Sequence, residues 1–278
     1  MIDNKIVREI EEFVFSKPRS MQEIAIHIKK SWRTADRYIQ EIEKEFGTLS
    51  VRTFREGTRG ALKIVYWASV EKLHSSVFQE KLEKELQIFK KKEDFSPFDI
   101  YQHVQEKNKK ATIEKTDSEN KTNLSELKEY LEKSEKQILS FSGNLSWINL
   151  KDKNTKIFSV IENLVKKRIS IKILSRVDLA SIKNIEKILS LNFKYGKELI
   201  EIRHIEQPLR SFIIDKKIAR IKEIKEPTGK IHELNKKVFI FYTLKDKEWI
   251  EWLSRIFWKQ FSNSIDAKKR IEELKNLR

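Results

Sequence analysis

The sequence predicts an α+β domain at the N-terminus, followed by an α/β domain with a largely buried sheet. Residues 21–67 change from helical to strand periodicity. Residues 124–263 alternate amphipathic helices with short apolar runs, which is typical of strands covered on both faces. The 278 residues are enough for about two domains. We place them at residues 1–70 and 123–278, with a charged, partly helical linker at 71–122.

The first helix of the N-terminal domain begins with a capping box. Ser20 and Glu23 have the S-x-x-E spacing in which each side chain satisfies a free backbone N–H at a helix start. Ile24 and Ile28 follow on one face of this helix. These positions predict a short amphipathic helix that packs on a core.

A second helix begins after a break at Lys29, Lys30 and Ser31, where Ser31 can act as the cap. Its apolar residues recur at helical spacing and are predicted to face inward: Ala35, Ile39 and Ile42. The opposite face carries polar residues that suit contacts with phosphates and base edges: Arg33, Thr34, Arg37 and Gln40.

Two strands follow, at residues 49–51 and 62–66, with the loop 56–60 between them. This order of elements resembles a winged helix-turn-helix domain. The resemblance implies that the second helix enters the major groove and that the strand hairpin lies along the backbone or minor groove. Carried onto this chain, the resemblance places Arg55 and Arg59 on the wing and these residues on the reading helix: Trp32, Arg33, Thr34, Arg37 and Gln40. We predict that Lys29 and Lys30 add phosphate contacts.

The same residues also allow interpretations that do not involve DNA. Winged helices also serve purely as protein-contact domains. Arg37 has the spacing to pair with Glu41 on the same helix, and Trp32 can be a packing residue. These alternatives leave the fold prediction unchanged.

The composition favours a polyanionic partner. The formal net charge is +16, from 58 Lys and Arg against 42 Asp and Glu. A lysine-rich genome would produce the same excess, so the arginines carry more information. The chain has no Cys and 5 His without metal-ligand spacing, so we predict no disulfide, metal or cofactor. No run is long enough to span a membrane, and we expect a cytoplasmic, nucleoid-associated protein without membrane contact.

The middle of the chain is predicted to hold one helix and a linker. Residues 70–89 carry an apolar stripe, which serves either packing on the same chain or pairing with a second copy. Residues 107–123 are polar and are the best linker candidate.

The C-terminal half alternates the two element types. Helices are predicted at residues 124–136, 157–168, 179–191 and 246–261, with a last charged helix at the end. Strands are predicted at residues 137–142, 169–174, 199–205 and 238–242, with a hairpin of 210–214 and 217–224 that turns at Asp215 and Lys216.

The segment from Pro208 to Asp215 has the frame of the phospholipase D signature H-x-K-x-x-x-x-D. Asp215 matches, and Arg210 is a conservative replacement for the lysine. The region resembles the degenerate phospholipase D-like domains behind the winged helix of archaeal TrmB-type regulators, over about residues 124–263. In the enzymes of that superfamily the histidine is the nucleophile and the lysine holds phosphate.

The departures from that signature argue against catalysis. Pro208 stands at the nucleophile position, and proline cannot attack phosphorus, so we predict no catalytic residues. A binding role remains in which four residues hold a small anionic or polar effector: Ser142, Asn144, His204 and Arg210. The alternative is that the hairpin is ordinary, Arg210 pairs with a glutamate, and the domain is a scaffold.

The helix at 246–261 is rich in large aromatic residues: Trp249, Trp252, Phe257, Trp258 and Phe261. They cover more than one face, so we expect part of them to be exposed and to form a homodimer contact. The whole sequence therefore predicts a transcriptional regulator that binds double-stranded DNA as a homodimer. The alternatives are an architectural chromatin protein and a phosphodiesterase or nuclease of the phospholipase D superfamily.

Overall fold

The computed structural model describes residues 2–45, 48–55, 61–67, 75–115, 124–151, 156–227 and 237–276. The chain divides into two compact units. The first consists of Met1–Lys81, Thr112–Asp117 and Ile224–Ile240, and the second of Leu82–Ala111, Ser118–Glu223 and Phe241–Arg278. Among the described residues, no helix is both long and apolar enough to cross a membrane.

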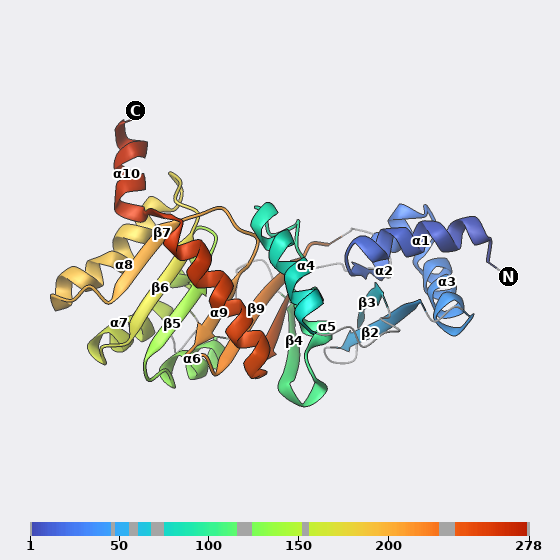
Figure 1. Ribbon diagram of the computed structural model, residues 1–278, viewed down its shortest axis with the longest axis horizontal. Helices are drawn as coiled ribbons and strands as arrows, with labels where there is room; N and C mark the ends of the chain where they lie inside the picture. The colour runs from blue at the N-terminus through green and yellow to red at the C-terminus, as the bar shows by residue number, and fades with distance from the viewer. Residues whose placement is uncertain are drawn as a thin grey trace. The chain divides into compact units, whose positions relative to one another are not determined.

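The first unit combines three helices with a small antiparallel sheet, which has the strand order β1-β3-β2 (Figure 1). Its elements are α1 (Asn4–Ser16), β1 (Arg19–Ser20), α2 (Met21–His27), α3 (Trp32–Glu45), β2 (Leu49–Arg55) and β3 (Ala61–Trp67). The two predicted helices and the two predicted strands are all present.

The core of this unit lies between the helices and the sheet. Ala35, Ile39 and Ile42 of α3 have no exposed surface, and they pack with side chains from α1, α2, β2 and β3. The capping box that opens α2 is also confirmed: Ser20 Oγ accepts the N–H of Glu23, and the Glu23 carboxylate accepts the N–H of Ser20 at 2.7 Å. The inward face of α3 is therefore the predicted one.

A mixed sheet of eight strands has the order β11-β7-β6-β5-β8-β9-β10-β4, and most of its residues belong to the second unit. Strands β5, β6 and β7 are parallel, while β8 is antiparallel to β5 and to β9. The strands are β4 (Lys109–Lys115), β5 (Gln137–Phe141), β6 (Ser170–Ser175), β7 (Ile200–His204), β8 (Ser211–Ile214), β9 (Ile218–Lys225), β10 (Val238–Leu244) and β11 (Ile265–Asp266).

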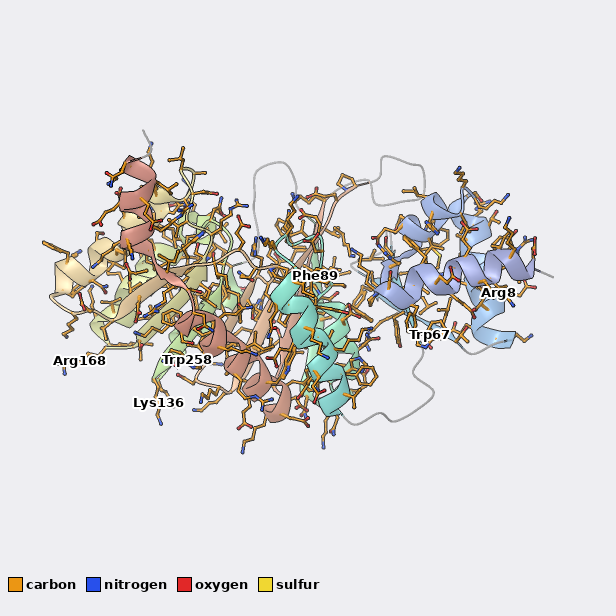
Figure 2. All side chains as sticks on the ribbon, turned by 45° about the horizontal axis from the view of Figure 1, so that its top comes forward. Arg8, Trp67, Phe89, Lys136, Arg168 and Trp258 are labelled. Carbon is orange, nitrogen blue, oxygen red and sulfur yellow. The ribbon has the colours of Figure 1, made fainter. Side chains whose placement is uncertain are left out.

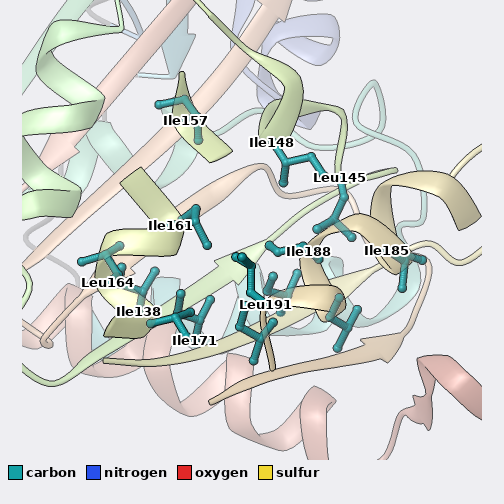
Figure 3. Close-up of a cluster of buried hydrophobic side chains, with 14 of the residues drawn as sticks. Ile138, Leu145, Ile148, Ile157, Ile161, Leu164, Ile171, Ile185, Ile188 and Leu191 are labelled. Carbon is teal, nitrogen blue, oxygen red and sulfur yellow. The ribbon is translucent and has the colours of Figure 1, made fainter. Parts of the chain in front are cut away.

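Helices cover both faces of this sheet. They are α4 (Ser75–Ile88), α5 (Phe98–His103), α6 (Ser125–Glu132), α7 (Ile157–Lys166), α8 (Ile182–Tyr195), α9 (Lys247–Ser262) and α10 (Ala267–Asn276), with short 3-10 turns η1 (Glu106–Asn108) and η2 (Ser146–Asn149). Alternate residues of β5 and β6 pack against α7 and α8 in one apolar cluster (Figure 3). Phe141 belongs to the other face, where its ring contacts Phe257 of α9.

Of two predictions for the middle of the chain, the helix is confirmed over its described residues and the linker needs correction. The helix expected at residues 70–89 is α4, Ser75–Ile88, and residues 70–74 lie outside the described part. Lys259 of α9 donates to the Glu83 carboxylate, and Gln260 of α9 donates to the Leu86 carbonyl. These bonds correspond to the first of the two expected alternatives, in which the helix packs on its own chain. The part of the expected linker from Lys109 to Lys115 is instead strand β4 at one end of the sheet order.

The exposed aromatic face expected on α9 is also wrong. Trp249, Trp252, Phe257 and Phe261 are buried within the chain, and Trp258 alone of the five retains 36 % exposure. The aromatic residues face the sheet and neighbouring helices; for example, the Trp249 ring stacks on His103 of α5. The reason for placing a homodimer contact here is thereby removed.

The predicted hairpin turns at Asp215 and Lys216, whose φ angles of 51° and 56° are left-handed. The Asp215 carboxylate leaves the turn to accept the backbone N–H groups of Glu135, Lys136 and Gln137 at 2.7–2.9 Å. Burial by itself would raise the pKa of this carboxyl, but these N–H groups outweigh it, so the pKa lies below its usual value. Asp215 therefore ties the hairpin to the start of β5.

We predict that Asp215→Asn destabilises the protein by about 1–2 kcal/mol at neutral pH, because a neutral amide replaces a charged acceptor of three N–H bonds. Asparagine tolerates the left-handed turn, so backbone strain does not contribute. The folded-state pKa is depressed, so the carboxylate's contribution is fully present above the unfolded-state pKa of about 3.9 and is lost as pH falls from there through the lower folded-state pKa. Urea unfolding of both proteins at a series of pH values from neutral to strongly acidic measures this. A stability difference that does not shrink as pH falls below about 4 contradicts it.

Candidate nucleic-acid interface

The turn between α2 and α3 is a Schellman motif. The N–H of Lys30 bonds the carbonyl of Ala25, and the N–H of Lys29 bonds that of Ile26. This closure requires a left-handed residue, which is Lys29, with φ of 53°. Glycine is the usual residue at such a position because it has no Cβ to clash. The turn thus presents the exposed side chains of Lys29 and Lys30 immediately before α3.

Ser31 caps α3, as predicted. Its Oγ accepts the N–H of Thr34 at 3.2 Å and also lies 2.9 Å from Thr34 Oγ1. Thr34 is therefore half-buried, and its hydroxyl is hydrogen-bonded to the Ser31 hydroxyl of the cap. The two hydroxyl residues fix the first turn of the helix that carries the arginines.

Arg33 and Arg37 project from the outer face of α3 and are exposed. Neither forms an ion pair with a described residue; Arg37 lies 5.3 Å from the centre of the Tyr38 ring. The alternative pair with Glu41 does not form, since the Glu41 carboxylate accepts the N–H of Ile2 at 3.1 Å. Two guanidinium groups on successive turns therefore remain available to a polyanion.

The acidic residue on the same face is neutralised locally. Asp36 binds Lys63 of β3 at 2.5 Å through one oxygen and Gln40 at 3.1 Å through the other. Gln40 is exposed but already holds one bond. Lys63 was not foreseen from the sequence. It compensates the Asp36 charge, so the cations of α3 are not cancelled by their own helix.

The remaining residues of the predicted interface fall into two groups. Trp32 is half-buried against the apolar cluster, and Lys63 Nζ lies 5.2 Å from its ring centre, so packing accounts for it. On the wing, Arg59 and the side chain of Arg55 lie outside the described residues, as does the loop 56–60. The described interface therefore consists of the α2–α3 turn and the first three turns of α3.

The charge of this surface follows the direction of the helix. Lys29, Lys30, Arg33 and Arg37 surround the N-terminal half of α3, where free N–H groups add positive potential. Acidic residues gather toward the C-terminal half, including Glu43. An anion is consequently attracted to the N-terminal half of the helix.

The four residues of the predicted effector pocket lie at one edge of the large sheet, where β5, β6 and β7 end and β8 begins. Three of them hold their own loops. Ser142 Oγ accepts Trp147 Nε1, Asn144 Oδ1 accepts the N–H of Ser146, and His204 Nδ1 accepts the N–H of Val177. His204 lies two strands away from Ser142, so the four side chains do not converge at one point.

Arg210 is the unusual member of this group. Its Nη1 donates to the carbonyls of Gln207 and Leu209, and its guanidinium lies where a Cβ on Gly143 would be. Burial lowers its pKa to about 10, Arg176 adds to that lowering, and Glu93 opposes it. No described carboxylate is within ion-pair distance, so the expected pairing with a glutamate is absent. Gly143 and Arg176 were not foreseen, because their proximity depends on the sheet register.

Metal binding finds no support in the described ranges, which contain no cluster of three or more His, Asp or Glu residues suited to a metal ion. Asp215, the matching residue of the signature frame, uses both carboxylate oxygens in backbone bonds at the far end of β8 from Arg210. The strand between them is four residues long, roughly 13 Å.

Comparison with known proteins gives weak likenesses only. No protein-family model and no curated protein matches the sequence. Among solved structures, the phospholipase D family member Nuc from Salmonella typhimurium shares 11% identity over 57% of this chain and 97% of its own, with a TM-score of 0.40. NucT from Helicobacter pylori shares 14% identity over 57% and 99%, also with a TM-score of 0.40.

TrmBL2, an archaeal chromatin protein, shares 16% identity over 95% of this chain and 94% of its own, with a TM-score of 0.38. All three scores lie below 0.5. Function therefore has to be inferred from the geometry of this chain itself.

We predict that Lys29→Gly raises the free energy of unfolding by about 0.5–1 kcal/mol, because it relieves the left-handed strain at this turn. Lys30→Gly is the matched control. Lys30 is not left-handed, so glycine there should lower stability by about the same amount through added chain entropy. Chemical denaturation of both variants measures the two signs. Equal destabilisation by both would contradict the assigned turn.

Proposed function

We propose that this protein binds double-stranded DNA through α3 and regulates transcription as a homodimer. The observation that carries the proposal is the exposed pair Arg33 and Arg37 on a helix whose opposite face is fully buried. A rigid helix with unpaired arginines on one side suits insertion into a groove, where guanidinium groups bind phosphates or guanine edges.

The arrangement of the unit supports the same proposal. The order α1-β1-α2-α3-β2-β3, with a three-stranded sheet β1-β3-β2, supports the proposal of a winged helix-turn-helix domain. In such domains the second helix of the pair reads the major groove and the strand hairpin contacts the backbone. Here that helix is α3, and Lys29 and Lys30 precede its N-terminus at the level of the phosphates.

For the α/β unit we propose a binding or scaffold role rather than catalysis. Pro208 stands at the nucleophile position of the signature frame, and the Asp215 carboxylate is committed to backbone N–H groups away from Arg210. Effector sensing enters the proposal through Arg210, a largely buried cation without an ion pair among the described residues. The phosphodiesterase alternative requires a nucleophile that none of these residues supplies.

We predict that Arg33→Gln and Arg37→Gln each weaken binding to a preferred duplex by about 1–3 kcal/mol if the arginine contacts a base. Glutamine keeps a long polar side chain on the helix surface, so folding is preserved. The matched control is Arg8→Gln, because Arg8 is an exposed arginine of α1 in the same unit. Fluorescence anisotropy with labelled duplex measures the change. If both α3 variants bind like the Arg8 variant, α3 is not the reading helix.

A regulator and an architectural DNA-coating protein give different results in selection from random duplexes. We predict enrichment of a motif with two half-sites about 10 base pairs apart, because a two-fold dimer places its reading helices one helical turn apart. Nuclease footprints on the enriched duplex should protect both half-sites together. Uniform protection without enrichment would favour the architectural alternative, and a single half-site would contradict the dimer.

A further inference from the structure

A row of cations follows the edge of the large sheet at which β5, β6 and β7 begin and the β8–β9 hairpin turns. This is the opposite edge from Arg210. The four chain segments at this edge are residues 133–137, 166–170, 194–200 and 214–218, which together hold nine Lys or Arg residues and three carboxylates. We define the basic edge as the five of these cations that have no ion pair or ring contact among the described residues: Lys136, Lys167, Arg168, Lys197 and Lys216.

Backbone bonds place the central members side by side. The N–H of Ser170 bonds the carbonyl of Lys136, which sets Arg168, two residues earlier, beside Lys136. On the other side, the Asp215 carboxylate accepts the N–H of Lys136, which brings Lys216 alongside. Figure 2 labels Lys136 and Arg168, whose side chains point outward at the same end of the sheet. The three cations therefore belong to one continuous surface.

The row continues across the sheet in strand order. Lys197 lies before β7, Lys167 and Arg168 before β6, Lys136 before β5, and Lys216 in the β8–β9 turn. At about 4.8 Å per strand, the basic edge spans roughly 14 Å. A duplex of that length carries about eight phosphate charges, at one charge per 1.7 Å. The spacing suits a linear polyanion better than a compact one.

The acidic residues of these four segments cancel only part of the positive charge of the basic edge. Asp215 is turned inward onto backbone N–H groups, and Glu135 is paired with Lys217 at 2.9 Å. Glu198 remains as an exposed carboxylate beside Lys197. The flanking lysines Lys133 and Lys194 are neutralised by Glu129 and Glu162 at 2.6 Å each. The basic edge is thus five cations against one unpaired carboxylate in the same segments.

Two of the five cations occupy backbone positions that favour glycine. Arg168 ends α7 in a Schellman motif with φ of 65°, and Lys216 has φ of 56° in the hairpin turn. The equivalent position after α8 is Gly196, with φ of 60°. At Arg168 and Lys216 the chain accepts a left-handed residue with a Cβ and places a positive charge at the edge.

We propose that the basic edge is a second binding surface for the phosphate backbone of double-stranded DNA, separate from α3 and indifferent to base sequence. The choice of DNA as the polyanion rests on the proposed function of α3. An anionic membrane is the less suitable partner, because Phe193 is the large apolar side chain exposed in this region and one such residue supplies little insertion. Two separate DNA contacts on one chain increase avidity for a single bent duplex or bridge two duplexes.

The test uses the full chain with the triple variant Arg168→Gly, Lys216→Gly and Lys136→Gln. Both glycine substitutions remove charge and relieve left-handed strain, so the Tm should stay equal or rise while DNA binding falls. Loss of binding then cannot come from misfolding. The matched control is the triple variant Lys183→Gln, Lys268→Gln and Lys269→Gln, which removes three exposed charges of α8 and α10 that lie outside the four segments of the basic edge.

Binding of a fluorescent duplex of arbitrary sequence is measured over a range of salt concentrations. Loss of three phosphate contacts should reduce the slope of log K against log salt by about 2–3 and weaken binding about tenfold or more near 0.1 M salt. The control triple variant should bind like the parent. An edge variant that binds like the control overturns the proposal, as does one that loses affinity for phosphatidylserine vesicles while it keeps duplex affinity.

The double variant Arg33→Gln, Arg37→Gln is measured in parallel and separates the two surfaces. If this variant binds both the preferred and the arbitrary duplex like the parent while the edge variant does not, the α3 proposal fails and the basic edge stands. If only the α3 variant loses affinity, the basic edge fails and α3 stands.

Discussion

Burial of Ala35, Ile39 and Ile42 fixes the rotation of α3 about its own axis, and the candidate DNA-binding surface of the first unit depends on that rotation. Three residues without exposed surface on one face leave the helix a single way to sit on α1, α2 and β3. Turning it by one residue, about 100°, would expose Ile39 and bring Thr34, Tyr38 and Glu41 to the inward face, where a carboxylate would be buried among apolar side chains. The positions of the arginines are therefore a consequence of apolar packing on the far side of the helix.

Much of this unit could be predicted from the sequence, because its helix caps and its apolar spacing depend only on residues that are close together in the chain. The helix caps need only residues three apart, as in the capping box of Ser20 with Glu23 and in the N-cap of Ser31 with Thr34. The rotation of α3 about its own axis follows from the 3.6-residue spacing of its apolar residues. What could not be foreseen is pairing between separate elements. Lys63 lies 27 residues from Asp36 in the chain, and the register of β3 alone brings the two together.

The second unit shows where periodicity fails. The sequence of strand β4 resembles a polar linker because this outermost strand carries lysines and few apolar residues. Proteins use such charged residues to prevent outermost strands from pairing with other chains. The aromatic residues of α9 cover more than one face, and the pattern alone does not say how many partners a helix has. In the structure the sheet lies on one side and α4 and α5 contribute contacts on others, as at Lys259 with Glu83 and at Trp249 with His103. The surplus aromatic surface is thus used within the chain.

Left-handed backbone positions connect the two candidate DNA surfaces. In the described residues, five non-glycine residues have positive φ: Lys29, Leu145, Arg168, Asp215 and Lys216. Three of the five are cations, and all three lie at the α2–α3 turn or at the basic edge. Each position costs about 1 kcal/mol relative to a residue without a Cβ, and Gly196 shows that the chain does use glycine at one such helix end. Lys29, Arg168 and Lys216 are exposed at these turns, whereas Leu145 is buried and the Asp215 carboxylate turns inward onto backbone N–H groups. At these three exposed positions local strain and local charge therefore occur together, because a cation with a Cβ occupies a turn whose left-handed backbone favours glycine.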